Sequence, residues 1–210
     1  IIDITDRRKA EDTIRHALAE KEVLLREIHH RVKNNLTGII SIIDLQIDSQ
    51  SEPAHVSLLR NLETRIRSMA LIHESLYQSK DLSNVIFAEY TENLMQFLFN
   101  AYDKRMDIRY RIEMGDLTLP IGTAMPCGLV MSEIVTNSLK YAFPDTFSCT
   151  AECGEPCIIT LSLTREEKCY RLRIADNGIG IPEGMDVNQN RSLGLHLISL
   201  IVKHQMRGTI

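Results

Sequence analysis

Long apolar runs are missing from this sequence. No stretch approaches the roughly 20 consecutive apolar residues that cross a bilayer, and no secretory signal opens the chain. We therefore expect a cytoplasmic segment without direct membrane contact, although upstream segments of a longer parent protein could still anchor it.

An excess of charge of either sign is also missing. The 24 lysines and arginines and the 28 aspartates and glutamates leave a net charge of −4, which gives no electrostatic reason to expect nucleic acid as a partner. We find neither repeats nor low-complexity tracts. With 44% hydrophobic and 25% charged residues, the composition is that of a globular protein with one or two domains.

The five cysteines lack the close pairing of common zinc sites. Three of them, Cys149, Cys153 and Cys157, stand at even spacing, whereas zinc frameworks usually combine four ligands with closely paired cysteines. We interpret the three as reduced thiols in a surface hairpin. A metal or redox site is the alternative.

Apolar residues recur at heptad spacing from Ile14 onward. A period of 3.5 residues indicates a helix that packs against another helix, and we expect this contact across a dimer. The residues of the predicted seam are Ile14, Leu18, Leu25, Ile28, Val32, Ile39 and Ile42.

A turn follows this helix. The segment SQSEP (49–53) ends the helix near Asp48 because its proline cannot sit inside one. A second amphipathic helix is predicted from about Ala54. Two antiparallel helices cannot enclose a core alone, so we expect two hairpins to form a four-helix bundle in a homodimer.

Helices and strands alternate irregularly beyond Asn84. Periodicity predicts helices over 87–101, over the apolar stretch 117–143 with Pro120 and Pro126 near its start, and over about 194–205. Alternation predicts strands over 107–114, 158–164 and 169–176. The expected fold class is α+β, with a dimerising helical hairpin followed by an α/β sandwich.

Two adjacent histidines occupy the first helix. Ile28 and Val32 belong to the predicted seam, so His29 and His30 are expected to lie off it and to face solvent. A neutral imidazole is a competent nucleophile near pH 7. The alternative is that these are solvated surface residues.

The segment SEIVTN places three functional groups on one helix face. Glu133, Asn137 and Lys140 are spaced i, i+4, i+7. Such a face can hold Mg²⁺ through the Asn137 carbonyl and contact phosphate through Lys140, with Glu133 near the water shell of the metal. An ordinary exposed polar face is equally consistent with this spacing.

Two glycine-containing segments follow. In DNGIG, Asp176 can accept a hydrogen bond from an exocyclic amine such as that of adenine, and Gly178 and Gly180 let the backbone approach a ligand. A tight turn is the alternative. In SLGLHL, Ser192 and Gly194 open a helix whose N-terminal amides can bind phosphate.

Five segments resemble, in this order, the sensor histidine kinases of two-component signalling. They are EIHHRVKNNL (27–36), RIRSMALIHESLYQS (65–79), LVMSEIVTNSLKYAF (129–143), DNGIG (176–180) and SLGLHL (192–197). The resemblance is strongest to the HWE-related subfamily whose phosphoacceptor helix carries HRVKN. It implies an ATP-binding domain of the GHKL type and a response-regulator receiver domain as partner.

The resemblance also implies roles for individual residues. His30 is the expected phosphoacceptor, with His29 as the fallback. Arg31 stands where many histidine kinases have an acid, so Glu27, one turn earlier, is a candidate proton acceptor. Glu133, a candidate for catalysis and for the metal shell, stands where many kinases have asparagine. The expected ligands of ATP and Mg²⁺ are Asn137, Lys140, Tyr141, Asp176, Gly178, Gly180, Ser192 and Gly194.

The resemblance divides the chain into segments. Residues 1–12 resemble the exit of a PAS sensor domain, residues 13–82 a dimerisation and phosphotransfer domain, and residues 83–210 a catalytic domain with incomplete C-terminal strands. Residues 147–157 look like an insertion. Two other functions stay open, a hydrolytic ATPase like the modules of gyrase, mismatch-repair and heat-shock chaperone proteins, and a non-catalytic docking module that binds nucleotide as a signal.

Overall fold

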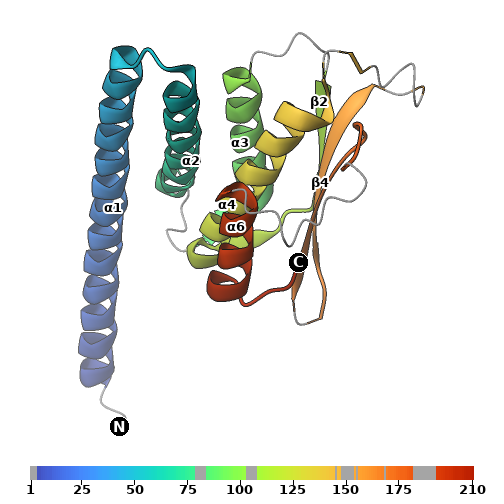
Figure 1. Cartoon of the computed structure of the whole chain (residues 1–210). Coiled ribbons are helices and arrows are strands. Elements are labelled where there is room, and N and C mark those ends of the chain that lie inside the picture. Colours follow the sequence, from blue (N-terminus) through green and yellow to red (C-terminus); the bar gives the residue numbers. More distant parts are fainter. Residues whose placement is uncertain are drawn as a thin grey trace.

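The computed structural model of the chain describes residues 4–78, 84–102, 108–144, 146–147, 154, 156–167, 169–181 and 193–210. A helical hairpin stands beside an α/β domain (Figure 1). Within these ranges, no helix is both long enough and apolar enough for a bilayer crossing.

The hairpin consists of α1 (Ile4–Ser49) and α2 (Pro53–Gln78). The turn and the start of α2 lie where the sequence predicts them, whereas α1 begins at Ile4, ten residues before the predicted heptad pattern starts at Ile14. Pro53 opens α2 at the first helical position, where its missing N–H deprives the helix of no hydrogen bond.

Helix α1 carries two apolar stripes. The stripe covered by α2 is buried or half-buried and consists of Leu25, Val32, Leu36, Ile40, Ile43 and Ile47. The second stripe is exposed in the single chain, and Ile28 and Ile42 belong to it with 54% and 62% of their surface accessible. The prediction of one seam is therefore wrong in detail, because its residues divide between two faces of the helix.

The α/β domain follows the hairpin. Its elements in chain order are β1 (Asn84–Ile86), α3 (Phe87–Ala101), β2 (Ile108–Met114), β3 (Thr118–Pro120), α4 (Ile121–Asn137), a π-helical turn (Ser138–Ala142), β4 (Cys157–Arg165), β5 (Tyr170–Asp176), α6 (Leu193–Leu200) and a second π-helical turn (Ile201–Gln205).

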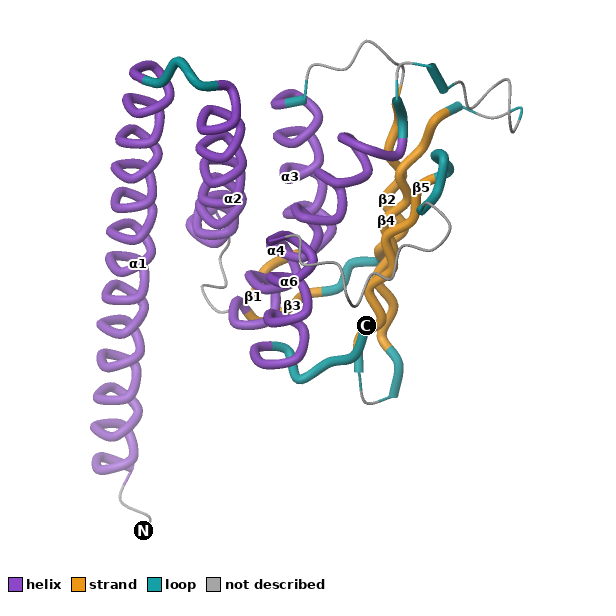
Figure 2. The backbone as a smooth tube through the Cα atoms, in the orientation of Figure 1, coloured by secondary structure: helices purple, strands orange, loops and turns teal. Residues whose placement is uncertain are grey.

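The main sheet has the order β2–β4–β5. Strand β2 runs parallel to β4, and β4 runs antiparallel to β5. Helices α3, α4 and α6 lie between this sheet and the hairpin (Figure 1; Figure 2). The predicted α+β fold is confirmed, and so are the predicted long helices and strands. The short antiparallel pair of β1 and β3 was not predicted, because three residues are too few to show a period.

The core of the domain lies between the sheet and helices α3 and α4. Strand β4 alternates, with every second side chain buried toward the helices, as expected for a strand with one face on the core. The largest fully buried side chains include Phe87, Tyr90, Leu94, Leu98, Met131 and Ile159.

One contact between α3 and α4 depends on glycine. A β-carbon placed on Gly128 would lie 1.9 Å from the Tyr90 hydroxyl oxygen and 2.7 Å from the ring carbon that bears it. That hydroxyl is buried, has no hydrogen-bond partner within the described part of the chain, and its pKa is raised by burial. Gly128 thus provides the space that the tyrosine ring fills.

We predict that Gly128→Ala destabilises the protein. Alanine improves helix propensity by about 1 kcal/mol, but overpacking against Tyr90 costs about 1–3 kcal/mol, so steric overlap should outweigh the gain. Urea unfolding of Gly128→Ala, Tyr90→Phe and the double variant would measure this. Tyr90→Phe should be nearly neutral alone and should recover part of the loss. A stabilised Gly128→Ala protein would contradict the packing described here.

Candidate functional site

A cavity of about 840 Å³ lies between the hairpin helix α2 and the α/β domain. This volume suits a small-molecule ligand. Its walls come from α2, α4 with its π-helical turn, the loop after β5, and the start of α6. The predicted ligands that line it are Glu133, Asn137, Lys140, Tyr141, Asp176, Gly180 and Gly194. Gly178 stands beside them in the loop after β5, and Ser192 lies outside the described residues.

The end of α4 supplies the first group of site residues. Glu133 is buried, with 7% of its surface accessible, and Asn137 and Lys140 are half-buried. The helix widens into a π-helical turn over Ser138–Ala142, a local form that is frequent at functional sites. Tyr141, in this turn, keeps 69% of its surface accessible at the cavity.

Glu133 and Lys140 contact helix α2. Both carboxylate oxygens of Glu133 accept hydrogen bonds from the Arg65 guanidinium, and the bond from Nη2 to Oε2 is 2.8 Å long. The Lys140 Nζ donates to the Asn61 Oδ1 at 2.6 Å and lies 5.6 Å from the centre of the Tyr102 ring. Burial lowers the pKa of Lys140. The predicted helix face is therefore present, but two of its three side chains, Glu133 and Lys140, are bound by residues of the hairpin.

Asp176 ends β5 with its carboxylate held in place. The Ser138 hydroxyl donates to Oδ2 at 2.7 Å, and the Gly178 N–H donates to Oδ1 at 3.2 Å. The side chain remains accessible at the cavity. A carboxylate oriented in this way can accept one more hydrogen bond from a ligand amine.

The loop after Asp176 requires its glycines. A β-carbon on Gly178 would lie 2.3 Å from the backbone carbonyl oxygen of Ala142. The same oxygen accepts a hydrogen bond from the Ile179 N–H at 2.9 Å, so the loop is fixed against the π-helical turn. Gly180 has φ +75°, a conformation that other residues rarely adopt.

The environment of His30 on α1 matches the expectation of an exposed imidazole. One turn earlier, Glu27 accepts a 2.6 Å hydrogen bond from the Arg31 Nε. This hydrogen bond, and then the charge of Arg31, lowers the pKa of Glu27. A less basic carboxylate is a weaker proton acceptor, so Glu27 would need to leave Arg31 before serving as one.

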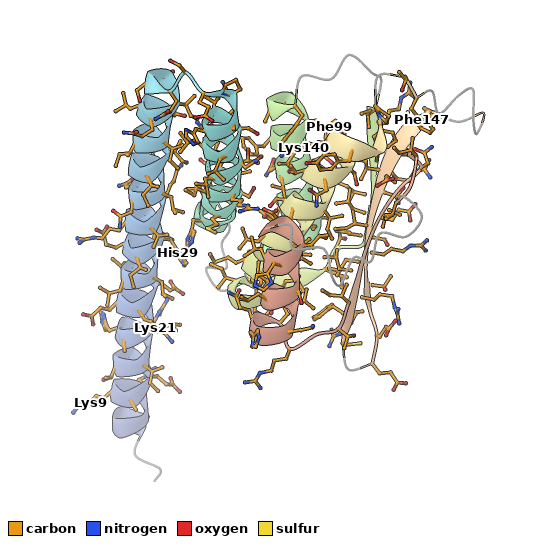
Figure 3. All side chains as sticks on the ribbon, in the orientation of Figure 1. Lys9, Lys21, His29, Phe99, Lys140 and Phe147 are labelled. Carbon is orange, nitrogen blue, oxygen red and sulfur yellow. The ribbon has the colours of Figure 1, made fainter. Side chains whose placement is uncertain are left out.

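The expectation for His29 is wrong. His29 is only 8% exposed and lies between α1 and α2 (Figure 3). Its Nδ1 stands 3.2 Å from the Nδ1 of His73, which is 7% exposed. His29 lies on the face of α1 that α2 covers. The predicted seam, centred on Ile28 and Val32, had placed His29 on the solvent-exposed side of the helix. Nearby, Lys33 donates to Glu74 at 2.6 Å and adds a second link between the two helices.

Sequence reasoning missed three residues that this site uses. Asn61 and Arg65 reach the cavity from α2, and His73 pairs with His29. The only signal for the first two was their i, i+4 spacing beside Leu58 and Leu62, which shows a helix face but not what that face contacts.

The cysteine prediction falls mostly outside the described residues, where Cys149 and Cys153 lie. Cys157 is buried and disulfide-bonded, so the prediction of a reduced thiol is wrong for this residue. Within the described part of the chain, no group of three or more His, Cys, Asp and Glu side chains is arranged to hold a metal ion.

We predict that the stability of the hairpin falls as the pH falls below neutral. Burial first, and then the positive charge of His29, lowers the pKa of His73 from its ordinary value of 6.5. The unfolded chain then binds the proton at a higher pH than the folded chain. Stability is fully present above about pH 6.5 and is lost as the pH falls through the lowered folded pKa.

Urea unfolding between pH 8 and pH 5 would measure this dependence. His73→Leu, which removes the titrating group, should flatten the curve relative to wild type. His16→Gln, which removes an exposed histidine of α1, should not. If the free energy of unfolding depends equally on pH in wild type and His73→Leu, the His29–His73 pair does not cause the loss of stability at low pH.

Two models of known protein families match successive segments of the chain. Residues 27–102 match the histidine kinase domain family, and residues 122–210 match the family of histidine kinase-, DNA gyrase B- and HSP90-like ATPases. The first match includes His30 and all of α2, and the second covers the described residues of the cavity that come from the α/β domain. The second family implies the use of ATP.

Curated relatives of this chain are named as histidine kinases. A sensor histidine kinase of Mycobacterium tuberculosis, PdtaS, is 28% identical over all of this chain and 40% of its own length. A blue-light-activated histidine kinase of Erythrobacter litoralis is 29% identical over 85% of this chain and 50% of its own length. The chain thus spans half or less of the length of these curated relatives.

A solved structure supports the fold. The histidine kinase domain of the Erythrobacter litoralis EL346 blue-light activated histidine kinase superposes with a TM-score of 0.57 at 24% identity, over 85% of this chain and 81% of that one. With a match to the histidine kinase family over residues 27–102 and to the ATPase family over residues 122–210 in one polypeptide, the chain belongs to the histidine kinases of the HWE-related type.

Proposed function

We propose that this chain phosphorylates His30 with ATP and passes the phosphoryl group to an aspartate of a response-regulator receiver domain. One observation carries the proposal. A cavity of about 840 Å³, lined by Asn137, Asp176, Gly180 and Gly194, lies in the same chain as an exposed imidazole on a kinase-type helix.

The cavity residues suit a nucleotide whose adenine lies at Asp176 and whose phosphates lie at the start of α6. The Asp176 carboxylate, oriented by Ser138 and the Gly178 N–H, would accept the hydrogen bond of the adenine amine. The amides at the start of α6, with Gly194 allowing close approach, would bind phosphate oxygens. The Asn137 side-chain oxygen would hold Mg²⁺, which supplies neutralisation of the charge that develops on the phosphates.

The transfer itself requires little covalent chemistry from the protein. A nitrogen of the His30 imidazole attacks the γ-phosphorus, and the N–P bond forms as the bond to the β,γ-bridging oxygen breaks and ADP leaves. The imidazole proton passes to a base, for which Glu27 and Glu133 are the candidates. In the second step the N–P bond breaks as an aspartate oxygen of the receiver domain takes the phosphoryl group.

The hairpin supports a dimer in this scheme. Residues 13–82 would form the dimerisation and phosphotransfer domain, residues 83–210 the catalytic domain, and residues 1–12 the exit of an upstream PAS sensor domain. The exposed stripe of α1 with Ile28 and Ile42 offers apolar surface for a second hairpin. The cytoplasm is the compartment in which ATP and a receiver domain would be available to it.

We predict that His30→Gln abolishes self-phosphorylation. Incubation with γ-labelled ATP and Mg²⁺ should give wild-type protein a label that is labile to acid and stable to base, because phosphohistidine has this chemistry. The label should be absent from His30→Gln and unchanged in His16→Gln. Strong labelling of His30→Gln would refute the assignment of the phosphoacceptor. Phosphate release much faster than labelling would favour a hydrolytic ATPase.

We predict that Gly178→Ala weakens nucleotide binding at least about tenfold, or about 1.4 kcal/mol. The added methyl group would overlap the Ala142 carbonyl, which lies 2.3 Å from the β-carbon position, and would displace the loop that orients Asp176. Calorimetric titration with a non-hydrolysable ATP analogue would measure the affinity. Gly122→Ala is the matched control, since its β-carbon would meet no atom within 4 Å. Equal affinities for the two variants would contradict the position assigned to the adenine.

A further inference from the structure

Helix α2 of the hairpin forms one wall of the cavity. The α2 residues that line it are Leu58, Asn61, Leu62, Thr64 and Arg65. The opposite wall belongs to the α/β domain. The hairpin therefore does not merely stand beside this domain but also limits access to the candidate nucleotide site.

The first link across this contact is the ion pair of Arg65 and Glu133. The guanidinium donates to both oxygens of the carboxylate, and the two side chains keep only 17% and 9% of their surface accessible. Bidentate, charge-assisted hydrogen bonds are among the stronger polar contacts in proteins, and partial burial protects this pair from screening by salt.

The second link is the hydrogen bond of Lys140 to Asn61, 2.6 Å long. It turns the ammonium group toward the hairpin. Arg65 and Lys140 are thereby both occupied by contacts across the same boundary, although each carries a charge that would suit a phosphate group.

The ion pair lies at the phosphate end of the cavity. The β-carbon position of Gly194 is 2.8 Å from the Glu133 Oε2 and 4.0 Å from both the Arg65 Nη2 and the Asn137 Nδ2. Gly194 opens α6, where the proposed function places the phosphates. The ion pair therefore occupies space next to the residues that would receive ATP and its metal ion.

The order of the helices separates the phosphoacceptor from this site. Helix α2 packs against α1 on one side and against α4 on the other, and α1 lies farther from the α/β domain (Figure 1). His30 is carried by α1. In this arrangement the hairpin presents α2 to the cavity, so transfer to His30 of the same chain requires the two parts to move.

We propose that Arg65 and Asn61 form a latch that holds the kinase in a resting state. The latch ties Glu133 and Lys140 to α2 and positions the catalytic domain away from His30. Mg²⁺ would compete with Arg65 for the Glu133 carboxylate, and phosphate would compete with Asn61 for the Lys140 ammonium group. Nucleotide binding and latch closure therefore oppose each other. The inference rests on the proposed function and assigns Arg65 as a positioning residue within it.

Arg65→Gln tests the latch. Without the guanidinium, the Glu133 carboxylate is buried without a cationic partner in the closed arrangement, which disfavours that arrangement. We expect the initial rate of His30 labelling to rise about five- to tenfold and the affinity for a non-hydrolysable ATP analogue to increase by a similar factor. Asn61→Ala should change both quantities in the same direction and by less.

Arg67→Gln is the matched control. Arg67 stands two residues away on α2, but it pairs within the hairpin with Glu63 and Asp44 at 2.7 and 3.7 Å. Its loss removes the same type of side chain without touching the cavity. We expect wild-type labelling and wild-type affinity for this variant.

Small-angle scattering without nucleotide gives a readout that does not depend on catalysis. Arg65→Gln should show a broader distribution of interatomic distances than wild type and Arg67→Gln, because the two parts separate. If labelling is absent from wild type and all variants, the proposed function is wrong. The scattering and the affinity for the ATP analogue then still test whether Arg65 and Asn61 form the latch. Unchanged scattering with unchanged affinity would overturn the latch. Weaker binding and slower labelling in Arg65→Gln would also overturn it, by making Arg65 a ligand of the nucleotide.

Discussion

The ion pair between Arg65 and Glu133 joins the two parts of this chain. It places α2 against α4, and that contact completes the wall of the cavity. Two charged side chains with little access to water are costly to leave unpaired, so each fixes the position of the other. The same contact leaves Asn137 and Asp176 open to the cavity while it engages Glu133. The ion pair thus holds α2 in place as one wall of the cavity that we propose to bind a nucleotide.

The hairpin has to meet two requirements that conflict. Under the proposed function, His30 would have to be reachable by the α/β domain, and its helix would have to be held firmly enough to present it. The inner face of α1 meets the second requirement through apolar contacts with α2, the His29–His73 pair and the Lys33–Glu74 bond. His30 lies off this face and is exposed. The contact of α2 with α4 and its π-helical turn includes the Arg65–Glu133 ion pair and the Lys140–Asn61 hydrogen bond, and such polar contacts suit an interface that opens and closes.

Much of the fold and of the candidate site follows from local patterns in the sequence. Periods of 3.6 and 2 located the long helices and strands, because these elements repeat one residue environment many times. Asn137, Asp176, Gly180 and Gly194, which line the cavity, could be named as candidates because each lies in a short segment with a recognisable local pattern. His29 could not be placed correctly, since a helix with two neighbouring apolar stripes does not reveal which stripe its own hairpin covers. The contact of Arg65 could not be predicted, because its partner Glu133 is distant in the chain.

By itself, the sequence determined the kinds of element, the order of the two parts, and the chemical groups that we propose to bind a nucleotide and to accept a phosphoryl group. These properties depend on residues close together in the chain, where spacing implies direction. Only the tertiary structure decided that β2 pairs in parallel with β4, that His29 is buried against His73, and that α2 reaches across to Glu133 and Lys140. Those contacts join residues far apart in the chain, and whether they form depends on packing that no local period encodes.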